Sequence, residues 1–107
     1  MDERAGYSLV MTACGSREEA ENLAASLVKN RLAACVQVTG ITSFYEWKMK
    51  FTKDDEFLLL IKTKAMLYKN IEFFISRNHS YEVPEIIELP IRNGSESFFH
   101  WIDEVSI

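Results

Sequence analysis

The chain has 107 residues, 48% of them hydrophobic, and a formal net charge of −4 at pH 7. That length suits one domain with its own core, and the apolar content excludes a disordered chain. The acidic balance excludes a nucleic-acid binder that relies on a basic surface, and the apolar runs are far shorter than the roughly 20 residues of a membrane helix.

The first expected elements are a strand over residues 7–13 and a helix that ends near Lys29. Ser16 followed by Glu19 is a capping box, in which the two residues hydrogen-bond across the first helical turn. Beyond this pair, apolar side chains recur at helical spacing. The chain is therefore predicted to start with a β-α unit.

A strand of unusual length is expected next. Apolar residues alternate on even positions up to Val38 and on odd positions from Ile41 to Phe51, with Gly40 between the two phases. A change of phase at a glycine predicts a β-bulge, because one extra residue exchanges the two faces of a strand. The segment is far longer than the usual 5–6 residues of a strand.

The second half of the chain also follows a regular order. It is expected to hold a polar turn at residues 52–55, a central strand at 56–63, a helix at 64–77, a strand at 86–91 and a terminal helix that opens at Ser95 or Ser97. The strand at 56–63 is predicted to be central because it is continuously apolar. Pro90 favours an edge position for the last strand, since proline donates no ladder hydrogen bond.

The order β-α-β-β-α-β, followed by a C-terminal helix, predicts an α+β domain with a ferredoxin-like antiparallel sheet in the order 4-1-3-2. We expect one domain over residues 1–107, with residues 1–6 as a disordered tail. In such a sheet the first strand ends at the rim where the fourth begins. Met11, Cys14, His79 and Tyr81 are therefore expected to gather there.

The two cysteines, Cys14 and Cys35, are too few for a disulfide framework. The topology places them at opposite ends of the sheet, so no bond between them is expected. Cys35 lies between apolar neighbours and is predicted to be a core residue. The charged N-terminus lacks the apolar stretch of a signal peptide, which predicts a cytoplasmic protein.

The outer part of the long hairpin is expected to extend past its own sheet and to expose an apolar stripe. A large apolar side chain left in water costs about 1.5–3 kcal/mol, and an uncovered edge favours aggregation. We therefore expect a second subunit to cover the stripe. Its residues are Ile41, Tyr45, Trp47, Met49 and Phe51.

His79–Ile86 (HSYEVPEI) places an imidazole, a phenol and two carboxylates in a short connector. Pro84 stiffens this connector and restricts Val83 to extended conformations, so the polar groups are held in fixed positions. Such a segment is either a functional loop or a polar loop that caps a helix end. The sequence shows no nucleophile paired with a base and no glycine-rich phosphate loop.

The segments Arg31–Val36 (RLAACV), Thr42–Trp47 (TSFYEW), Leu60–Thr63 (LIKT) and His79–Ile86 (HSYEVPEI), in that order, resemble the CutA family of divalent-cation tolerance proteins. The resemblance extends over about residues 7–105. It implies a ferredoxin-like homotrimer, similar to the signalling PII proteins, with long hairpins packed between subunits. It also implies an association with divalent metals, copper above all, without an established enzymatic reaction.

The expected metal ligands are His79, Cys14 and Met11. Thiol and thioether sulfur select Cu(I), and imidazole suits Cu(II). The chain shows no set of three or four ligands at a recognisable spacing. Several positions depart from the family pattern. Ser80 replaces a usual proline, and the usual glycine shortly after Trp47 is missing. Met11 and Asn78 stand where some members carry a cysteine and a second histidine.

A small ligand or a metal is expected in a cleft between subunits, where the hairpin of a neighbouring chain approaches the rim. The candidate residues of this cleft are Tyr45, Glu46, Trp47, Lys62, Tyr81, Glu82 and Glu85. We expect binding without catalytic turnover, and neither nucleic acid nor a membrane as partner.

Two other functions stay open. One is an acylphosphatase-like hydrolase on the same scaffold, with Arg17 or Lys62 holding a phosphate. The other is a purely structural or anchoring trimer. The fold alone does not choose among them, because ferredoxin-like domains host many unrelated functions.

Overall fold

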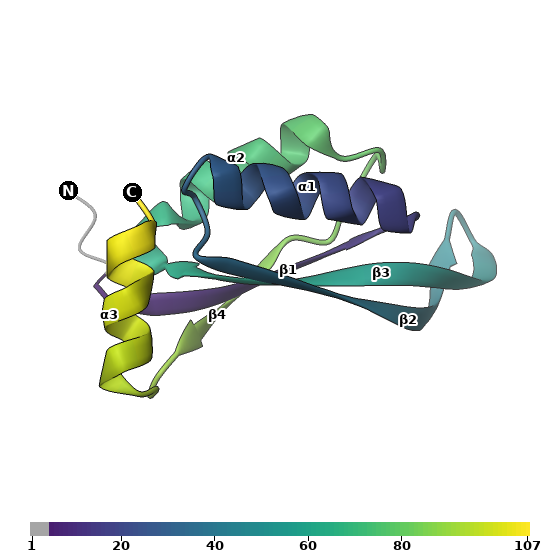
Figure 1. The fold of residues 1–107 in the computed structure, drawn as a ribbon. Coiled ribbons are helices and arrows are strands. Elements are labelled where there is room, and N and C mark those ends of the chain that lie inside the picture. The colour runs from purple at the N-terminus through teal and green to yellow at the C-terminus, as the bar shows by residue number, and fades with distance from the viewer. Residues whose placement is uncertain (1–4) are drawn as a thin grey trace.

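The computed structural model describes residues 5–107, in which two helices cover one face of an antiparallel sheet and a third helix lies at one end (Figure 1). The elements in chain order are β1 (Tyr7–Cys14), α1 (Arg17–Lys29), β2 (Cys35–Trp47), β3 (Lys50–Lys64), the 3-10 helix η1 (Ala65–Leu67), α2 (Tyr68–Asn78), β4 (Ile87–Ile91) and α3 (Glu96–Val105). The predicted α+β ferredoxin-like arrangement is confirmed. Within the described chain, every helix is too short or too polar to cross a membrane.

The predicted tail at residues 1–6 lies mostly outside the described residues, which begin at Ala5. The carbonyl of Gly6 accepts a hydrogen bond from the Ala65 N–H at 2.9 Å. This bond joins the segment before β1 to the end of β3.

The strands lie in the order β2-β3-β1-β4, which is the predicted order. β3 is hydrogen-bonded on both sides, as its continuous apolar sequence indicated. β4 pairs only with β1 and forms an edge of the sheet, where Pro90 interrupts no inner ladder.

The core lies between the sheet and the two helices α1 and α2. Ser16 caps the start of α1, and its side-chain oxygen accepts a hydrogen bond from the Glu19 N–H at 3.1 Å, as the capping box predicted. Each fully buried aliphatic side chain contributes roughly 1.5–3 kcal/mol to stability. The largest ones in this core are Val10, Leu27, Leu59, Ile61, Ile71 and Ile75.

The β2–β3 hairpin extends past the rest of the sheet, as predicted. β3 pairs with β1 only as far as Phe57, opposite Cys14, but with β2 as far as Lys50, opposite Trp47. In Figure 1 the tip of this hairpin lies beyond the end of α1 and curves toward the helix side of the sheet. The outer hairpin therefore has no support from β1.

Two predictions about this hairpin are wrong, since the turn lies at Lys48–Met49 rather than at residues 52–55, and Gly40 forms no bulge. Pairing between β2 and β3 is continuous through Gly40 to the turn. Lys48 and Met49 have φ of 51° and 66°, the left-handed conformation of a two-residue hairpin turn. Asparagine or glycine usually marks this turn, so the Lys-Met pair gave no sequence signal.

The change of apolar phase at Gly40 has another cause. Before it, the even-numbered residue Val38 packs against the core under the helices. After it, the hairpin has passed the end of β1, and apolar residues such as Ile41 lie on the opposite face of the strand. Side chains along β2 therefore alternate between the two faces without interruption. The apolar residues change from even to odd positions because they face the core before Gly40 and the opposite face after it.

The position of the turn also divides the predicted apolar stripe. Directly paired residues share a face, so Phe51 lies with Glu46 on one face of the hairpin. Met49 lies in the turn and is 92% exposed. Of the predicted stripe, only Ile41, Tyr45 and Trp47 share a face of β2.

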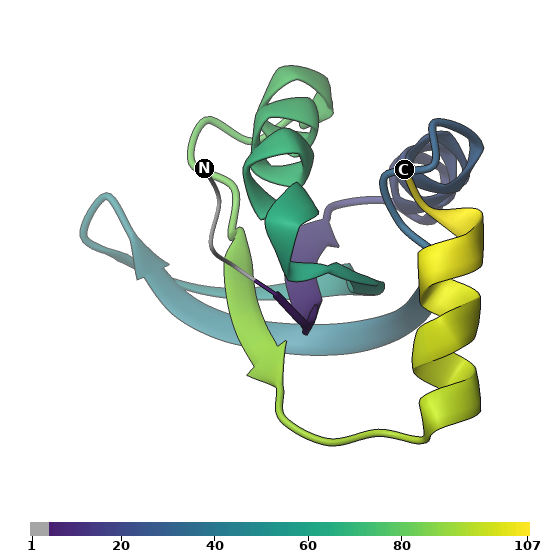
Figure 2. The same cartoon turned by 90° about the vertical axis from the view of Figure 1, so that its left-hand side faces the viewer.

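The sheet face away from α1 and α2 carries apolar side chains that these two helices do not cover. After β4 the chain crosses on that side to α3, which lies at one end of the sheet (Figure 2). The apolar residues on this open face are Leu9, Met11, Leu58 and Leu60, which are half-buried, and Ile87 and Leu89, which are exposed. We call these six residues the open sheet face.

Candidate functional site

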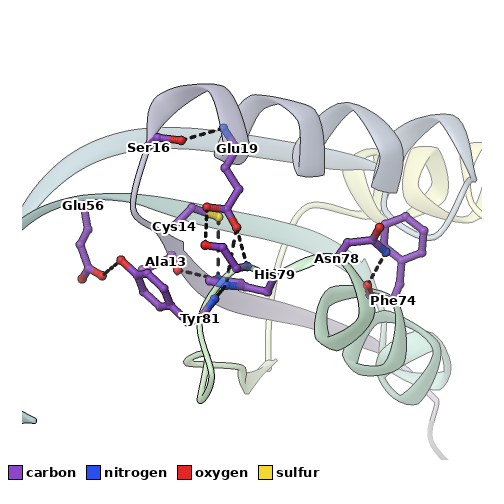
Figure 3. Close-up of polar contacts among 10 residues, drawn as sticks. Ala13, Cys14, Ser16, Glu19, Glu56, Phe74, Asn78, His79 and Tyr81 are labelled. Atoms are coloured by element: carbon purple, nitrogen blue, oxygen red, sulfur yellow. Dashed lines mark hydrogen bonds and ion pairs between the residues drawn. The ribbon is translucent and has the colours of Figure 1, made fainter.

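The segment of residues 79–86, which we call the His79 loop, passes the end of β1 on its way from α2 to β4 (Figure 3). α2 ends at Asn78, whose side-chain amide donates to the Phe74 carbonyl at 2.8 Å. The loop then leaves the helix layer and reaches the edge of the sheet. Its side chains face the end of β1 and the outer hairpin.

His79 holds the loop to the sheet through both ring nitrogens. Its imidazole is fully buried. Nε2 lies 2.8 Å from the Ala13 carbonyl oxygen, which can only accept, and Nδ1 lies 3.1 Å from the Tyr81 N–H, which can only donate. These partners select the neutral tautomer with hydrogen on Nε2.

Glu19 joins the loop to α1. One carboxylate oxygen accepts a hydrogen bond from the Ser80 N–H at 2.9 Å, and the other accepts from the Ser80 hydroxyl at 2.9 Å. In a full capping box this carboxylate returns to the first residue of its own helix. Here it connects α1 to the His79 loop instead.

Cys14, Glu19 and His79 form the one group of three potential metal-ligating side chains found in residues 5–107, and we call it the His79 cluster. Their ligand atoms all lie within 4.8 Å of one another. The Cys14 Sγ lies 3.9 Å from the His79 Nε2. The spacing of these atoms alone is compatible with a metal ion, so whether the cluster can bind one depends on the protonation and hydrogen bonds of its donor atoms.

The donors of the His79 cluster do not fit a copper ion. The Nδ1 lone pair is taken by the Tyr81 N–H, and Nε2 carries the proton that the Ala13 carbonyl accepts. Burial raises the pKa of the Cys14 thiol to about 11, with the negative charges of Glu19 and Glu56 adding to the effect. A metal needs a thiolate and a free imidazole lone pair, and this cluster offers neither.

Met11, the third predicted copper ligand, lies on the other side of the sheet. It is three residues from Cys14 on the same strand, and residues an odd number apart point to opposite faces. Cys14 belongs to the core under the helices, whereas Met11 lies on the open sheet face. The prediction that these two side chains share a site is therefore wrong.

A cleft of about 710 Å³ lies between the outer hairpin and the His79 loop, and we call it the hairpin cleft. The Tyr81 hydroxyl donates to the Glu56 carboxylate at 2.7 Å and so joins the loop to β3. A side chain on Gly15 would meet the Tyr81 hydroxyl oxygen at 3.1 Å, so glycine allows the phenol to lie here. The cleft is lined by Ala13, Ser43, Phe44, Tyr45, Trp47, Glu56, Ser80, Tyr81, Glu82, Val83 and Glu85.

The two phenols of the cleft are held in their protonated form. The Tyr45 hydroxyl donates to the Asp54 carboxylate, and this bond is the main cause that raises the pKa of Tyr45 to about 12. Burial, followed by the hydrogen bond to Glu56, raises the pKa of Tyr81 well above its usual range. Both phenols are hydrogen-bond donors at neutral pH, and neither is a nucleophile.

The structure brings most of the predicted cleft residues together, namely Tyr45, Trp47, Tyr81, Glu82 and Glu85. Glu46 is not among the lining residues. Lys62 lies near the C-terminal end of β3, where its ammonium donates to the Gln37 side chain, outside the cleft. One chain supplies both walls, so a neighbouring subunit is not needed to bring the hairpin to the loop, because the outer hairpin curves back over its own rim.

Sequence reasoning did not single out two carboxylates that organise the site. Glu19 was assigned to helix capping alone, although a capping-box acid can also reach a loop beside the helix. Glu56, only 7% exposed, opens a continuously apolar strand. A lone acid at the start of a central strand was the signal that could have identified it, since buried acids need a hydrogen-bond partner.

Comparisons with known proteins find relatives along nearly the whole described chain. A family model described as CutA1 divalent ion tolerance protein matches residues 8–105. The protein CutA of Mus musculus is 39% identical over 100 residues, which are 92% of this chain and 56% of the mouse protein. The divalent-cation tolerance protein CutA of Thermus thermophilus is 38% identical over 97 residues, which are 90% of this chain and 94% of that protein.

A solved structure shows the same fold. The periplasmic divalent cation tolerance protein CutA from Archaeoglobus fulgidus superposes with a TM-score of 0.91 at 34% identity, over 92% of this chain and 97% of that one. The chain spans about half the length of several curated relatives that it matches, including 56% of the mouse protein.

The raised pKa of Cys14 predicts how stability depends on pH. The pKa is about 11 in the folded chain and 9.0 for an ordinary thiol, so the folded state keeps a proton that the unfolded state loses. The contribution of the neutral thiol is complete below pH 9 and is lost as pH rises toward 11. Urea unfolding at pH 8, 9 and 10 should show falling stability in the wild type and a smaller fall between pH 8 and 10 in Cys14→Ala. Equal slopes in the two proteins would contradict a buried neutral thiol.

Proposed function

The chain belongs to the CutA1 divalent ion tolerance family, and we propose that it acts there as a non-catalytic binding protein whose ligand occupies the hairpin cleft. The observation that carries this proposal is the cleft itself, with aromatic walls and a few converging polar groups. Its volume of about 710 Å³ is that of a typical small-molecule site.

The absence of catalysis is supported by the state of the nucleophilic groups. The Cys14 thiol and the phenols of Tyr45 and Tyr81 all have raised pKa values, so they are protonated at neutral pH. Enzymes that use such groups lower their pKa or pair them with a base. The pKa values of Cys14, Tyr45 and Tyr81 are shifted in the opposite direction.

The hydrolase alternative finds little support in the positions of its two basic residues. Arg17 pairs with Glu21 at 3.6 Å and lies 4.9 Å from the centre of the Phe57 ring. Lys62 lies five residues beyond Phe57 on β3, which is roughly 16 Å from Phe57 at strand spacing. Each candidate cation already has a partner within the chain, Arg17 with Glu21 and Lys62 with Gln37.

Ligand binding in the cleft can be tested by thermal unfolding against a panel of metabolites and divalent metals. A true ligand at 100 times its dissociation constant should stabilise the wild type by about 2.7 kcal/mol. Glu82→Gln and Tyr81→Phe should reduce this shift, because both residues line the cleft. Glu72→Gln, which alters an exposed carboxylate on α2, is the control. A shift that survives both cleft substitutions unchanged places the ligand elsewhere and contradicts the proposal.

We also propose that the chain assembles as a homotrimer. The support from this molecule is the open sheet face, which leaves six apolar side chains uncovered by helices. The family resemblance supplies the number of subunits. Whether Ile41, Tyr45, Trp47, Met49 and Phe51 contact a second subunit stays a prediction.

Light scattering at micromolar concentration should give three times the chain mass. Leu60→Arg should lower that mass, because Leu60 lies at the centre of the open sheet face on β3, opposite Met11. The matched control is Val28→Arg, which alters an exposed valine on α1, on the other side of the sheet. A stable wild-type monomer, or equal effects of the two substitutions, would contradict assembly through this face.

Copper, the metal implied by the resemblance, enters the proposal only as a weakly bound surface ion that does not use His79. Calorimetric titration with Cu(II) should therefore give affinities within about threefold for wild type and Cys14→Ala. His79→Ala should lose about 1–3 kcal/mol of stability, because two backbone groups lose their partner, while its copper affinity also stays within about threefold. A tenfold loss of affinity in either variant would show that the cluster opens to bind copper.

A further inference from the structure

The hairpin cleft has a clear charge preference. The residues that line it in the described chain include Glu56, Glu82 and Glu85 but no lysine, arginine or histidine. Glu56 is buried and already accepts the Tyr81 hydroxyl. The other two carboxylates are exposed at the mouth of the cleft. A ligand with positive charge therefore fits better than a neutral or anionic one.

The aromatic walls add a second preference for cations. Phe44, Tyr45 and Trp47 are 63%, 39% and 42% exposed, which is unusual for side chains of this size. No helix of the described chain lies above the outer hairpin (Figure 1), and the Phe44 ring is faced by the Lys53 ammonium at 5.8 Å from its centre. Aromatic faces attract ammonium groups, and the attraction is stronger where water is excluded.

A lysine of the chain itself lies between an aromatic ring and a carboxylate at the mouth of the cleft. The Lys48 ammonium lies 5.7 Å from the centre of the Trp47 ring and 3.9 Å from the Glu82 carboxylate. Lys48 and Glu82 have side chains 73% and 74% exposed, so this ion pair is weak and easily displaced. A ligand ammonium that enters deeper can replace it.

A divalent metal ion fits the cleft less well. The His79 cluster is the one described group whose three ligand atoms lie within 4.8 Å of one another, so the cleft carboxylates do not converge in that way. Carboxylate-bound cations such as Mg²⁺ and Ca²⁺ need several oxygen ligands around one point. An ammonium needs only one carboxylate and an aromatic face.

We propose that the hairpin cleft binds a small organic molecule that carries a protonated primary amine. The ammonium group pairs with Glu82, with Glu85 close by, and the apolar part lies against Tyr45 and Trp47. The hydrogen bond from Tyr81 to Glu56 holds the opposite wall in place. This inference rests on the proposed function, because it names the ligand class of the same cleft.

The test uses phenethylamine as the probe and 2-phenylethanol as its neutral counterpart, each titrated calorimetrically into the full chain at pH 7. The amine should bind at least tenfold more tightly than the alcohol. Glu82→Gln should weaken amine binding about tenfold, a difference of about 1.4 kcal/mol, and Trp47→Leu should weaken it as well. Glu85→Gln gives a second carboxylate variant at an exposed position.

Lys48→Gln provides the discriminating measurement. It frees Glu82 and the Trp47 face, so amine affinity should rise by about two- to fivefold. The matched controls are Lys69→Gln and Glu72→Gln, which alter another exposed pair, at 3.5 Å, whose ammonium lies 5.9 Å from the Tyr68 ring on α2. Neither control should change amine affinity.

Three results would overturn the inference: equal affinity for the amine and the alcohol, no effect of either carboxylate substitution, or weaker binding in Lys48→Gln. If neutral or anionic compounds from the metabolite panel stabilise the protein through the cleft while the amine does not, the proposed function stands and this ligand class is wrong. If no compound acts through the cleft, both proposals fail.

Discussion

The buried imidazole of His79 is the constraint on which the site depends. It accepts from the backbone of its own loop and donates to the backbone of β1, so it fixes the position of one segment relative to the other. Two carboxylates complete the attachment, since Glu19 binds Ser80 and Glu56 binds Tyr81. The loop is thus held by α1 and by the two inner strands β1 and β3. Without these bonds a segment of eight residues with only one proline would have no fixed position, and the cleft would lose one wall.

The same bonds explain why the histidine is better understood as a structural residue than as a metal ligand. A ligating imidazole keeps one nitrogen free and uses the other for a supporting hydrogen bond. In this chain both nitrogens are occupied by backbone groups. The thiol beside it is kept neutral by burial and by nearby carboxylates. The group has the residue types of a metal site and the hydrogen bonds of a structural one.

The fold could be predicted from the sequence because periodicity, capping and proline placement all indicated the same topology. Ser16 predicted the start of a helix and Pro90 predicted an edge strand. Both predictions rest on local backbone chemistry, the first on a side-chain cap and the second on a missing N–H. The turn at Lys48–Met49 could not be found, because neither residue favours the left-handed conformation that it adopts. The contacts of Glu19 and Glu56 were missed for a different reason. They depend on which loop lies beside them in space, and local pattern does not carry that information.

The turn also has a consequence for how the molecule moves and folds. Two non-glycine residues in the left-handed region each cost roughly 1–2 kcal/mol, so strand pairing is not expected to start at the turn. We expect the β2–β3 pairing to form first at the base of the hairpin, where β1 and the helices support it, and to extend toward the turn. The backbone hydrogen bonds of the outer hairpin then form last and break first, and their amide hydrogens should exchange with solvent faster than those near Leu59. One wall of the cleft thus belongs to the least stable part of the sheet. A ligand that contacts both walls of the hairpin cleft slows the breaking of those hydrogen bonds. Ligand binding is therefore coupled to the local stability of the outer hairpin.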